Sequence, residues 1–431
     1  MKTYIFCLAA MLPPACFGQV AGPPRLPSDM EQMDVKQAIA EAIDRNLGLL
    51  AERANLTVAE AARISARLRP NPVVSAAADH LNNSLGTRFS QINAAGPTEI
   101  SLRVDLPIER ARKRELRLET ATLARTVAEA QLENAIRRLR LDVQLACIDI
   151  LEAKTKLSLA RDNLQALERL VSLNESRLAS GAIAPLEVTR TKVAMLQYRT
   201  SVRAAELELA TSRARLAPLL GRRSGGQVID IAGELPAQTP PRRTTLDEIE
   251  SLAIANRPDL AALQREQART QADLRLQIAQ GKVDYSVGME YRRQQGINGT
   301  GNMLGFFVSA PLPVFNRNQG EIARATAEGE RTHRSIRAAQ NEILSEVFTA
   351  HQEYQSALRL VDEIQKELLV SADEARKTTA YVYQSGATTL LDALDSQRAF
   401  NETMLTYYTA QANLSRVATR LAAAAGLETL P

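Results

Sequence analysis

Residues 381–398 read Tyr-Val-Tyr-Gln-Ser-Gly-Ala-Thr-Thr-Leu-Leu-Asp-Ala-Leu-Asp-Ser-Gln-Arg. A long helical run is predicted to end just before Gly386, because glycine adopts positive φ without strain and commonly ends helices. A second helix is predicted to begin near Thr389, since Asp392 follows it at the spacing of a capping box. The stretch is therefore predicted to form the tip of a helical hairpin, with Asp392 and Asp395 on one face of the outgoing helix.

A second tip of the same kind lies about 205 residues earlier in the chain, which indicates an internal duplication. There a helical run ends, the chain turns at Gly181, and a new helix begins with Pro185, a residue that suits a first helical turn. Ser180-Gly181-Ala182 matches Ser385-Gly386-Ala387, and Leu186-Glu187 matches Leu391-Asp392. We therefore expect two repeats, residues 22–220 and 246–431, joined by a linker over residues 221–245 that lies on the outside of the structure.

The composition indicates long helices rather than a large compact core. The chain of 431 residues has 4% aromatic residues and no tryptophan, and Leu, Ala, Arg, Glu and Gln dominate. Its net charge of +4 is small beside 53 basic and 49 acidic residues, which are interleaved along the predicted helices. Such interleaving is typical of solvated helix faces, so a nucleic-acid partner is not expected.

The first 21 residues have the pattern of a secretory signal peptide. Lys2 supplies a positive charge, an apolar core follows, and small residues allow cleavage after Gly18 or Ala21. Cys16 raises the question of a lipid anchor, but the residues before it, Pro13-Pro14-Ala15, make a poor lipobox. After removal of the signal only Cys147 would remain, so no intramolecular disulfide is expected.

Each repeat is predicted to contain a helix, two strands, a long helix, a glycine tip and a return helix. A heptad seam of apolar residues runs along the long helix of the first repeat, which is typical of coiled-coil packing. In the first repeat the expected elements are a helix over Val35–Leu68, strands over Val73–Asp79 and Ile100–Leu106, the latter ended by Pro107, a helix over Glu109–Ser180 and a helix over Glu187–Leu220. In the second they are a helix over Leu246–Gln280, strands over Val283–Arg292 and Leu304–Leu312, a long helix to Ser385 with Gly329 as its weak point, and a helix to Ala425.

The strands alternate between apolar and polar residues at a period of two, most clearly around Leu102 and Val287, whereas alanines blur the alternation in Val73–Asp79. A soluble sheet would turn the apolar face inward, whereas a porin-like barrel would turn it toward lipid, and the pattern alone does not choose between them. No apolar run after the signal is long enough for a membrane-spanning helix, so any insertion must use strands. The expected lipid-facing residues are Ile100, Leu102, Val104, Val283, Tyr285 and Val287.

Four strands of about ten residues are long enough to cross a bilayer but too few to close a barrel around a passage. Open strand edges do not occur in lipid, so several chains would have to pool their strands. Twelve strands from three chains would leave a wide lumen.

With these features together, the mature chain resembles the TolC family of outer-membrane factors. The duplication, the strand pairs, the long helices and both tips match the family, and the Gly386…Leu391-Asp392-Ala-Leu-Asp395 motif resembles the family's Gly…Asp-Val-Leu-Asp tip. The stretch Pro311-Leu-Pro-Val-Phe-Asn-Arg-Asn-Gln-Gly320 resembles the strand-to-helix corner of the heavy-metal branch, the CzcC-like proteins.

The resemblance implies a mainly helical fold with transmembrane strands: a homotrimer that forms a twelve-stranded β-barrel in the lipid of a Gram-negative outer membrane and a long periplasmic α-helical barrel. It also implies docking to a periplasmic adaptor and an inner-membrane RND-type pump, for which the chain would be a passive exit duct exporting metal cations. Drug efflux and type I protein secretion are alternative tasks for the same duct. A soluble periplasmic coiled-coil scaffold or adaptor is an alternative of another class.

The resemblance also implies roles for residues at the tips. Asp392 and Asp395 would form acidic rings at a narrow periplasmic entrance and favour cations, although acids in a first helical turn also stabilise the helix dipole. Glu187 and Tyr383 match positions that help to hold the mouth closed, but Thr388 stands where the family has an arginine of that closure network. Gly181 and Gly386 are expected in the turns and in adaptor docking.

The sequence gives no sign of an enzyme or of a metal or cofactor site. The three histidines, His80, His333 and His351, are scattered, and Cys147 lies on a heptad helix, so no metal-ligand spacing appears. No phosphate-binding loop and no nucleophile–base set can be argued. We therefore expect neither catalysis nor a cofactor.

Overall fold

The computed structural model describes residues 30–79, 81, 98–223, 228–235, 245–296 and 299–430. The expected signal peptide, Cys16, His80 and most of the loop that follows the expected strand Val73–Asp79 lie outside these residues. In chain order the elements are β1 (Met30–Met33), α1 (Val35–Arg45), α2 (Leu47–Arg67), β2 (Val73–Asp79), β3 (Glu99–Ile108), α3 (Lys113–Ala179), α4 (Pro185–Leu219), β4 (Val228–Ile231), α5 (Leu246–Asn256), α6 (Pro258–Gln280), β5 (Tyr285–Gly296), β6 (Gly299–Ser309), α7 (Gln319–Glu363), a π-helical turn (Ile364–Leu368), α8 (Leu369–Gln384) and α9 (Leu390–Ala424).

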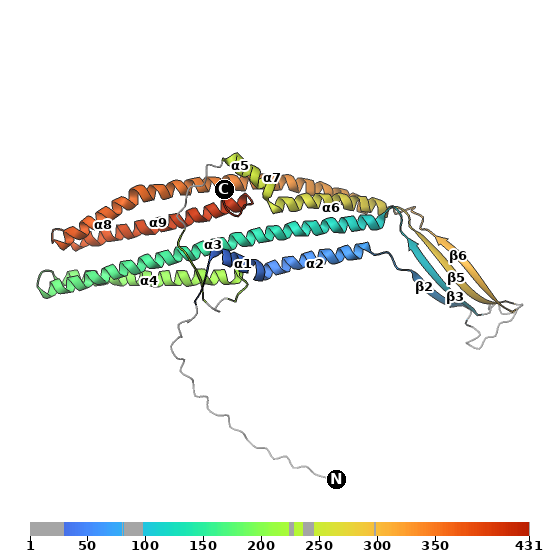
Figure 1. Ribbon diagram of the computed structural model, residues 1–431, viewed down its shortest axis with the longest axis horizontal. Helices are drawn as coiled ribbons and strands as arrows, with labels where there is room; N and C mark the ends of the chain where they lie inside the picture. Colours follow the sequence, from blue (N-terminus) through green and yellow to red (C-terminus); the bar gives the residue numbers. More distant parts are fainter. Residues whose placement is uncertain are drawn as a thin grey trace, which may run out of the picture.

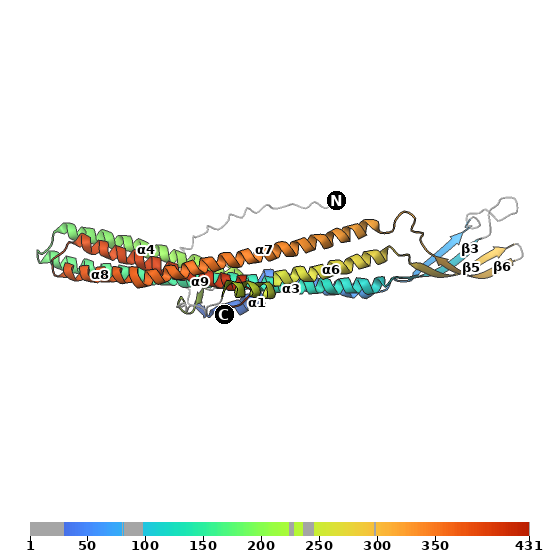
Figure 2. The same cartoon turned by 90° about the horizontal axis from the view of Figure 1, so that it is seen from above.

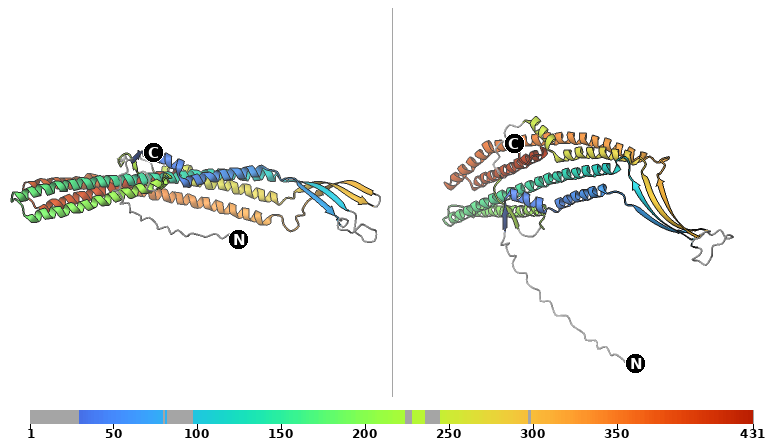
Figure 3. Two further views of the ribbon diagram at one scale, coloured as in Figure 1. Left: turned by 90° about the horizontal axis from the view of Figure 1, so that it is seen from below. Right: turned by 45° about the vertical axis from the view of Figure 1, so that its right-hand side comes forward.

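The molecule is long, with the strands at one end and two helical hairpin tips at the other (Figure 1). The longest helix, α3, has 67 residues, which corresponds to about 100 Å at 1.5 Å per residue. Nearer the strands the helices lie side by side in the order α2, α3, α6, α7, and toward the tips in the order α4, α3, α9, α8. The other views show that this single layer is curved rather than flat (Figures 2 and 3).

The duplication is visible in how each repeat begins and ends. We expected one helix at the start of each repeat, and this was wrong: Asn46 separates α1 from α2, and Arg257 separates α5 from α6. Asn46 Nδ2 donates to the carbonyl of Leu219, and Arg257 Nη1 donates to that of Ala424. In both repeats, a polar side chain at the break therefore binds the C-terminal end of the return helix.

The four strands form one antiparallel sheet in the order β2-β3-β5-β6, so β3 and β5 join the two repeats. Pro107 does not end its strand as expected, because β3 continues to Ile108, and beyond Asp105 it pairs only with β5. The long helix begins later than expected, at Lys113, because Ala111 and Arg112 have positive φ.

Two strand boundaries and the course of one helix also correct the sequence interpretation. Val283 precedes β5, which begins at Tyr285, and β6 ends at Ser309, before Leu312. Gly329 lies inside an unbroken helix, and the irregularity occurs instead at the π-helical turn Ile364–Leu368.

The linker strand is inside the structure rather than on its outside. β4 pairs in parallel with β1, and Ile229 and Ile231 are 3% and 0% exposed. They join the larger core cluster, which packs α1, β4 and α4 against the heptad seam of α3. The expected seam is confirmed where it is covered, since Val143 and Ile150 are fully buried.

None of the described helices is apolar over a length that would cross a membrane. The observed fold is mainly helical with one four-stranded sheet, which confirms the fold class that the sequence predicted.

Candidate functional site

Both hairpin tips turn at the glycines that the sequence singled out. Gly181 has a φ of 73° and Gly386 a φ of 81°, in the left-handed region that favours glycine. The amide of Ala182 donates to the carbonyl of Arg177 over 2.8 Å, and the amide of Ala387 donates to that of Val382 over 3.0 Å. The two turns therefore share one hydrogen-bonding pattern, which satisfies the last carbonyls of each long helix.

The outgoing helix of the second tip starts with the predicted capping box. Thr389 is the N-cap of α9, and its hydroxyl accepts from the amide of Asp392 while Asp392 accepts from the amide of Thr389. The hydroxyls of Thr389 and Thr388 also donate to Asp392 Oδ2, over 2.6 and 2.9 Å. These hydrogen bonds, that of Thr389 first, lower the pKa of Asp392.

The two acids at this tip therefore differ. Asp392 is exposed but occupied by its cap, whereas Asp395 is exposed and its carboxylate has no hydrogen bond or ion pair with any residue that the structure describes. Thr388 is one of the donors to Asp392. Its hydroxyl therefore supports the cap at the start of α9.

Tyr383 and Glu187 are connected by a short relay of hydrogen bonds. The Tyr383 hydroxyl donates to Asn174 Oδ1 over 3.0 Å, and Asn174 Nδ2 donates to the Thr191 hydroxyl over 2.9 Å. Thr191 then donates to the backbone carbonyl of Glu187 over 2.8 Å. Tyr383 is 5% exposed, and Asn174 and Thr191 are fully buried. The relay ties α8 to both helices of the first hairpin, and the Glu187 side chain takes no part in it.

Arg177 adds a second link between the tips. Its Nη2 donates to the carbonyl of Gln384 over 2.7 Å, and its guanidinium carbon lies 5.4 Å from the centre of the Tyr383 ring. Both contacts join the end of α3 to the end of α8, so each tip is held to the other by a cation as well as by the buried relay.

Further polar contacts between the hairpins occur farther from the tips. Asn163 Nδ2 donates to Asn401 Oδ1 over 2.5 Å, and Gln397 Nε2 donates to Asn163 Oδ1 over 3.0 Å. Still farther from the tips, Arg416 donates to Asp149 over 2.8 Å and also to the buried Glu152. Side-chain hydrogen bonds and ion pairs thus join α3 to α9 at two places along their length.

Sequence reasoning missed Asn163, Asn174 and Thr191, although one signal for Asn174 was present. One line of the heptad seam reads Leu132, Leu139, Ala146, Ala153, Ala160, Leu167, and Asn174 is its next member. A polar residue at a core position of a heptad usually marks a specific polar contact. Nothing in the sequence identified the partner on the other repeat.

At the opposite end, the sheet has one apolar face that the described residues leave uncovered. In β3, Ile100, Leu102 and Val104 are 55%, 49% and 40% exposed. The register places Tyr291 and Met289 opposite the last two, and these pair in turn with Leu304 and Phe306 of β6. Tyr285 and Val287 lie on the same face and are 38% and 41% exposed.

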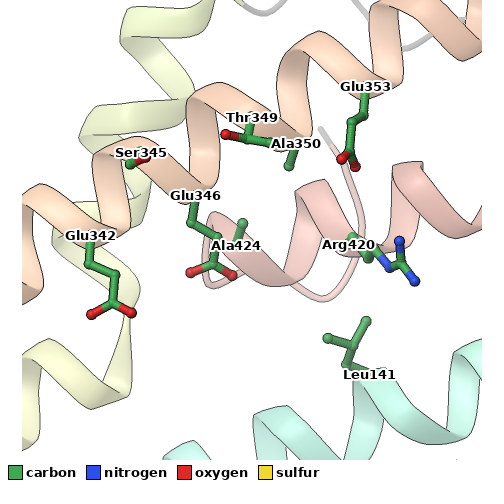
Figure 4. A pocket seen from close by; sticks show the side chains of 9 residues that line it. All are labelled: Leu141, Glu342, Ser345, Glu346, Thr349, Ala350, Glu353, Arg420 and Ala424. Carbon is green, nitrogen blue, oxygen red and sulfur yellow. The ribbon is translucent and has the colours of Figure 1, made fainter.

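A groove of about 550 Å³, lined by both charged and apolar side chains, lies where α7, α9 and α3 approach one another (Figure 4). Glu342, Glu346 and Glu353 line it from α7 and Arg420 from α9. Glu346 accepts from Arg257, so it already belongs to the contact at the helix break. In the described part of the chain no three acidic, histidine or cysteine side chains are close enough together to hold a metal ion.

Cys147 is buried in the core of α3, where burial raises the pKa of its thiol to about 12. A thiol in that environment stays protonated and unreactive at neutral pH. The structure therefore gives it a packing role.

Comparison with known proteins identifies the family of this fold. A family model described as "Outer membrane efflux protein" matches residues 38–222 and 250–427, which cover most of the chain in two segments. The chain is 24% identical to the cobalt-zinc-cadmium resistance protein CzcC of Cupriavidus metallidurans, over 87% of this chain and 85% of that protein. It is 25% identical to nodulation protein T of Rhizobium leguminosarum bv. trifolii, over 91% and 82% of the two chains.

Solved structures support the fold independently. The outer membrane protein VceC from Vibrio cholerae superimposes with a TM-score of 0.70 at 18% sequence identity, over 91% of this chain and 96% of that chain. At this identity the likeness concerns the arrangement of helices and strands.

Proposed function

The chain belongs to the outer membrane efflux protein family, and we propose that it is the passive outer-membrane exit duct of a tripartite efflux system. The observation that carries this proposal is the sheet with one exposed apolar face. Lipid is the partner that suits an uncovered apolar sheet face, and a water-filled lumen suits the polar face behind it. The Gram-negative outer membrane is the location that fits both.

The two edges of the molecule support closure into a ring of identical chains. β2 and β6 are the outer strands of the sheet, and neither pairs with a further described strand. On the β2 side, α2 and α4 expose apolar residues such as Val58 and Leu207, at 67% and 66%. On the β6 side, α7 and α8 expose Phe348 and Tyr381, at 50% and 73%.

Two different edges that are both unpaired give a head-to-tail interface. Such an interface closes into a ring when a whole number of copies completes one full turn. A homotrimer would pool twelve strands into a barrel and twelve long helical segments into a periplasmic tube. Pairing of β6 with the β2 of the next copy would leave no strand edge in lipid.

The tips would then form the periplasmic mouth. We propose that they dock, through the turns at Gly181 and Gly386, to a periplasmic adaptor that connects the duct to an inner-membrane RND-type pump. The relay from Tyr383 to Asn174 would hold the closed mouth, and the exposed Asp395 would contribute an acidic ring with Asp392.

Metal cations are the cargo that we propose, since acidic rings favour cations and one relative carries the name of a cobalt-zinc-cadmium resistance protein. Nodulation protein T, whose name mentions no metal, has a similar identity and coverage. The alternative cargo for the same duct is therefore a drug or a secreted protein. Specificity of that kind would belong mainly to the pump.

The test is the location and oligomeric state of the mature chain. Membranes are fractionated, and the mass of the purified protein is measured in detergent. We expect a trimer that is extracted only by detergent from the outer membrane. A soluble monomer or dimer would overturn the proposal and favour a periplasmic coiled-coil scaffold.

A further inference from the structure

The face of the sheet behind the apolar one carries an ordered set of charges. Alternation along the strands and the strand register together place each side chain on one face or the other. Seven charged residues occur within β2, β3, β5 and β6, and six of them lie on the polar face. These are the acids Asp79, Glu99, Asp105 and Glu290 and the bases Arg103 and Arg292, while Arg293 lies on the apolar face.

Five of these groups form one chain of alternating sign across β3 and β5. Arg103 donates from Nε and Nη2 to the two oxygens of Asp105, over 2.8 and 2.7 Å. Glu290 is the direct cross-strand partner of Arg103 and is 7% exposed. Arg292 donates to Glu290 over 2.9 Å and lies 3.5 Å from Glu99.

The neighbouring residues leave room for this chain of charges. A Cβ added at Gly288 would lie 2.3 Å from Asp105 Oδ1, so only glycine leaves space for the ion pair there. The Arg103 guanidinium carbon lies 4.4 Å from the centre of the Phe307 ring, a cation–π contact. A Cβ at Gly305 would in turn lie 3.0 Å from that ring. The cluster is thus fixed in position by its surroundings.

The charges do not cancel. Arg103 and Arg292 neutralise two of the four acids, which leaves a surplus of two negative charges on this face of each chain. The surplus lies at the end of the sheet farthest from the helices, where Asp79 and Glu99 are direct partners across β2 and β3. Asp79 is exposed and, among the residues that the structure describes, its carboxylate has no hydrogen bond or ion pair.

We propose that the polar face of the sheet is a second charge filter of the duct, in which the alternating chain fixes the wall and the rim acids Asp79 and Glu99 favour cations. Rings of charged side chains select ions by sign in this way. The inference rests on the proposed function, because only a sheet closed around a passage places these groups in the path of the cargo. It adds a filter at the outer end, remote from the tips.

The experiment measures reversal potentials of the purified full chain in planar lipid bilayers under a potassium chloride gradient. The background variant is Asp392→Asn with Asp395→Asn, so that acids at the mouth do not mask the rim. In that background, Asp79→Asn with Glu99→Gln should lower the cation-to-anion permeability ratio by roughly twofold or more. Arg293→Gln, a charge change on the other face of the same sheet, is the matched control and should leave the ratio unchanged.

The possible outcomes separate this inference from the proposed function. A conducting channel whose ratio does not change in the Asp79→Asn, Glu99→Gln variant would overturn the filter alone. An equal shift in the Arg293→Gln control would overturn the assignment of faces on which it depends. Failure of the unmodified protein to form a conducting oligomer would overturn the duct itself.

Discussion

Tyr383 of the second repeat donates a 3.0 Å hydrogen bond to Asn174 of the first, across a sequence separation of 209 residues. Both side chains are buried, and Asn174 passes the contact on to Thr191 of α4. Four helices of two hairpins meet at the tips, and the relay from Tyr383 through Asn174 to Thr191 joins three of them. In the proposed duct this contact, like the one between Arg177 and Gln384, must break for the tips of the hairpins to separate.

Replacing Tyr383 with Phe should loosen the mouth. The variant keeps the ring but leaves Asn174 Oδ1 buried without a donor, a loss of about 1–3 kcal/mol at that contact. We expect higher single-channel conductance or more frequent opening in planar bilayers. Tyr381→Phe is the matched control, because Tyr381 is 73% exposed in the same helix. Equal behaviour of the two variants would mean that the relay does not hold the mouth.

Lysine introduced on the apolar face of the sheet should impair assembly, whereas lysine on the polar face should not. Lysine at Leu102 or Val287 would face lipid, where a cation costs about 2–4 kcal/mol at the bilayer midplane. We expect these variants to lose most of their detergent-extractable trimer from the outer membrane fraction. Lysine at Ser101 or Ser286, each adjacent to one of those positions but on the polar face, should be tolerated. Similar yields from both faces would contradict the lipid-facing assignment.

The elements that the sequence predicted well are those determined by local chemistry. The positive φ of Gly386 and the capping box of Thr389 with Asp392 depend only on neighbouring residues. The period-two alternation around Leu102 gives the faces of a strand because the pleat is itself local. These patterns could be interpreted without knowledge of any distant contact.

The features that were missed depend on contacts between repeats. The break at Arg257 is held by the carbonyl of Ala424, 167 residues away, and no local signal announces such a partner. β4 was assigned to an exterior linker because it is short and flanked by Gly and Pro, but it is buried by pairing with β1. The partner of Asn174 was likewise inaccessible to any pattern along the chain.

Mutation should distinguish the roles of the two acids at the tip. Asp395→Asn should reduce cation selectivity and leave helix stability unchanged, because its carboxylate has no partner in the described residues. Asp392→Asn should reduce selectivity and also weaken the start of α9, where Asp392 completes the capping box. Reversal potentials and thermal unfolding of each variant make the comparison. Loss of stability in Asp395→Asn alone would contradict these roles.

Acid should not readily discharge Asp392. Hydrogen bonds from Thr389 and Thr388 hold its pKa below the ordinary carboxyl value. Its negative charge, and the selectivity that depends on it, should therefore persist as the pH falls through that ordinary value and be lost only below it. The measurement is the reversal potential as a function of pH in a variant that combines Asp395→Asn with Asp79→Asn and Glu99→Gln, which leaves Asp392 as the remaining acid of the two proposed filters. Full loss of selectivity at the ordinary carboxyl pKa would contradict the prediction.

The buried strand β4 should make stability sensitive to acid. Burial raises the pKa of Asp230, but hydrogen bonds and charges of Arg213 and Lys154 outweigh it and leave the pKa lowered. A carboxyl whose folded pKa is depressed stabilises the protein above its unfolded pKa and loses that contribution as pH falls through the folded value. We expect Asp230→Asn to lower the free energy of unfolding at pH 7 by about 1–3 kcal/mol.

Urea unfolding at several pH values tests this prediction. The difference in stability between the unmodified protein and Asp230→Asn should shrink as pH falls from the ordinary carboxyl pKa through the lowered pKa of folded Asp230, below which neither protein carries the charge. Asp362→Asn, at an ion pair of exposed side chains with Lys366, is the matched control and should change little at any pH. A difference that stayed constant with pH would rule out the ion pairs of Asp230 as its cause.

Two glycines with the same backbone conformation should respond differently to alanine. Gly181 and Gly221 have φ values of 73° and 72°, so alanine costs each about 1–2 kcal/mol in conformational strain. A Cβ at Gly181 would meet nothing within 4 Å, whereas one at Gly221 would lie 2.2 Å from the carbonyl oxygen of Arg45. Gly221→Ala must therefore also displace the backbone at the break between α1 and α2, and it should lose clearly more stability in thermal unfolding. Because strain is matched in the pair, equal losses would show that the contact between the return helix and the helix break yields without cost.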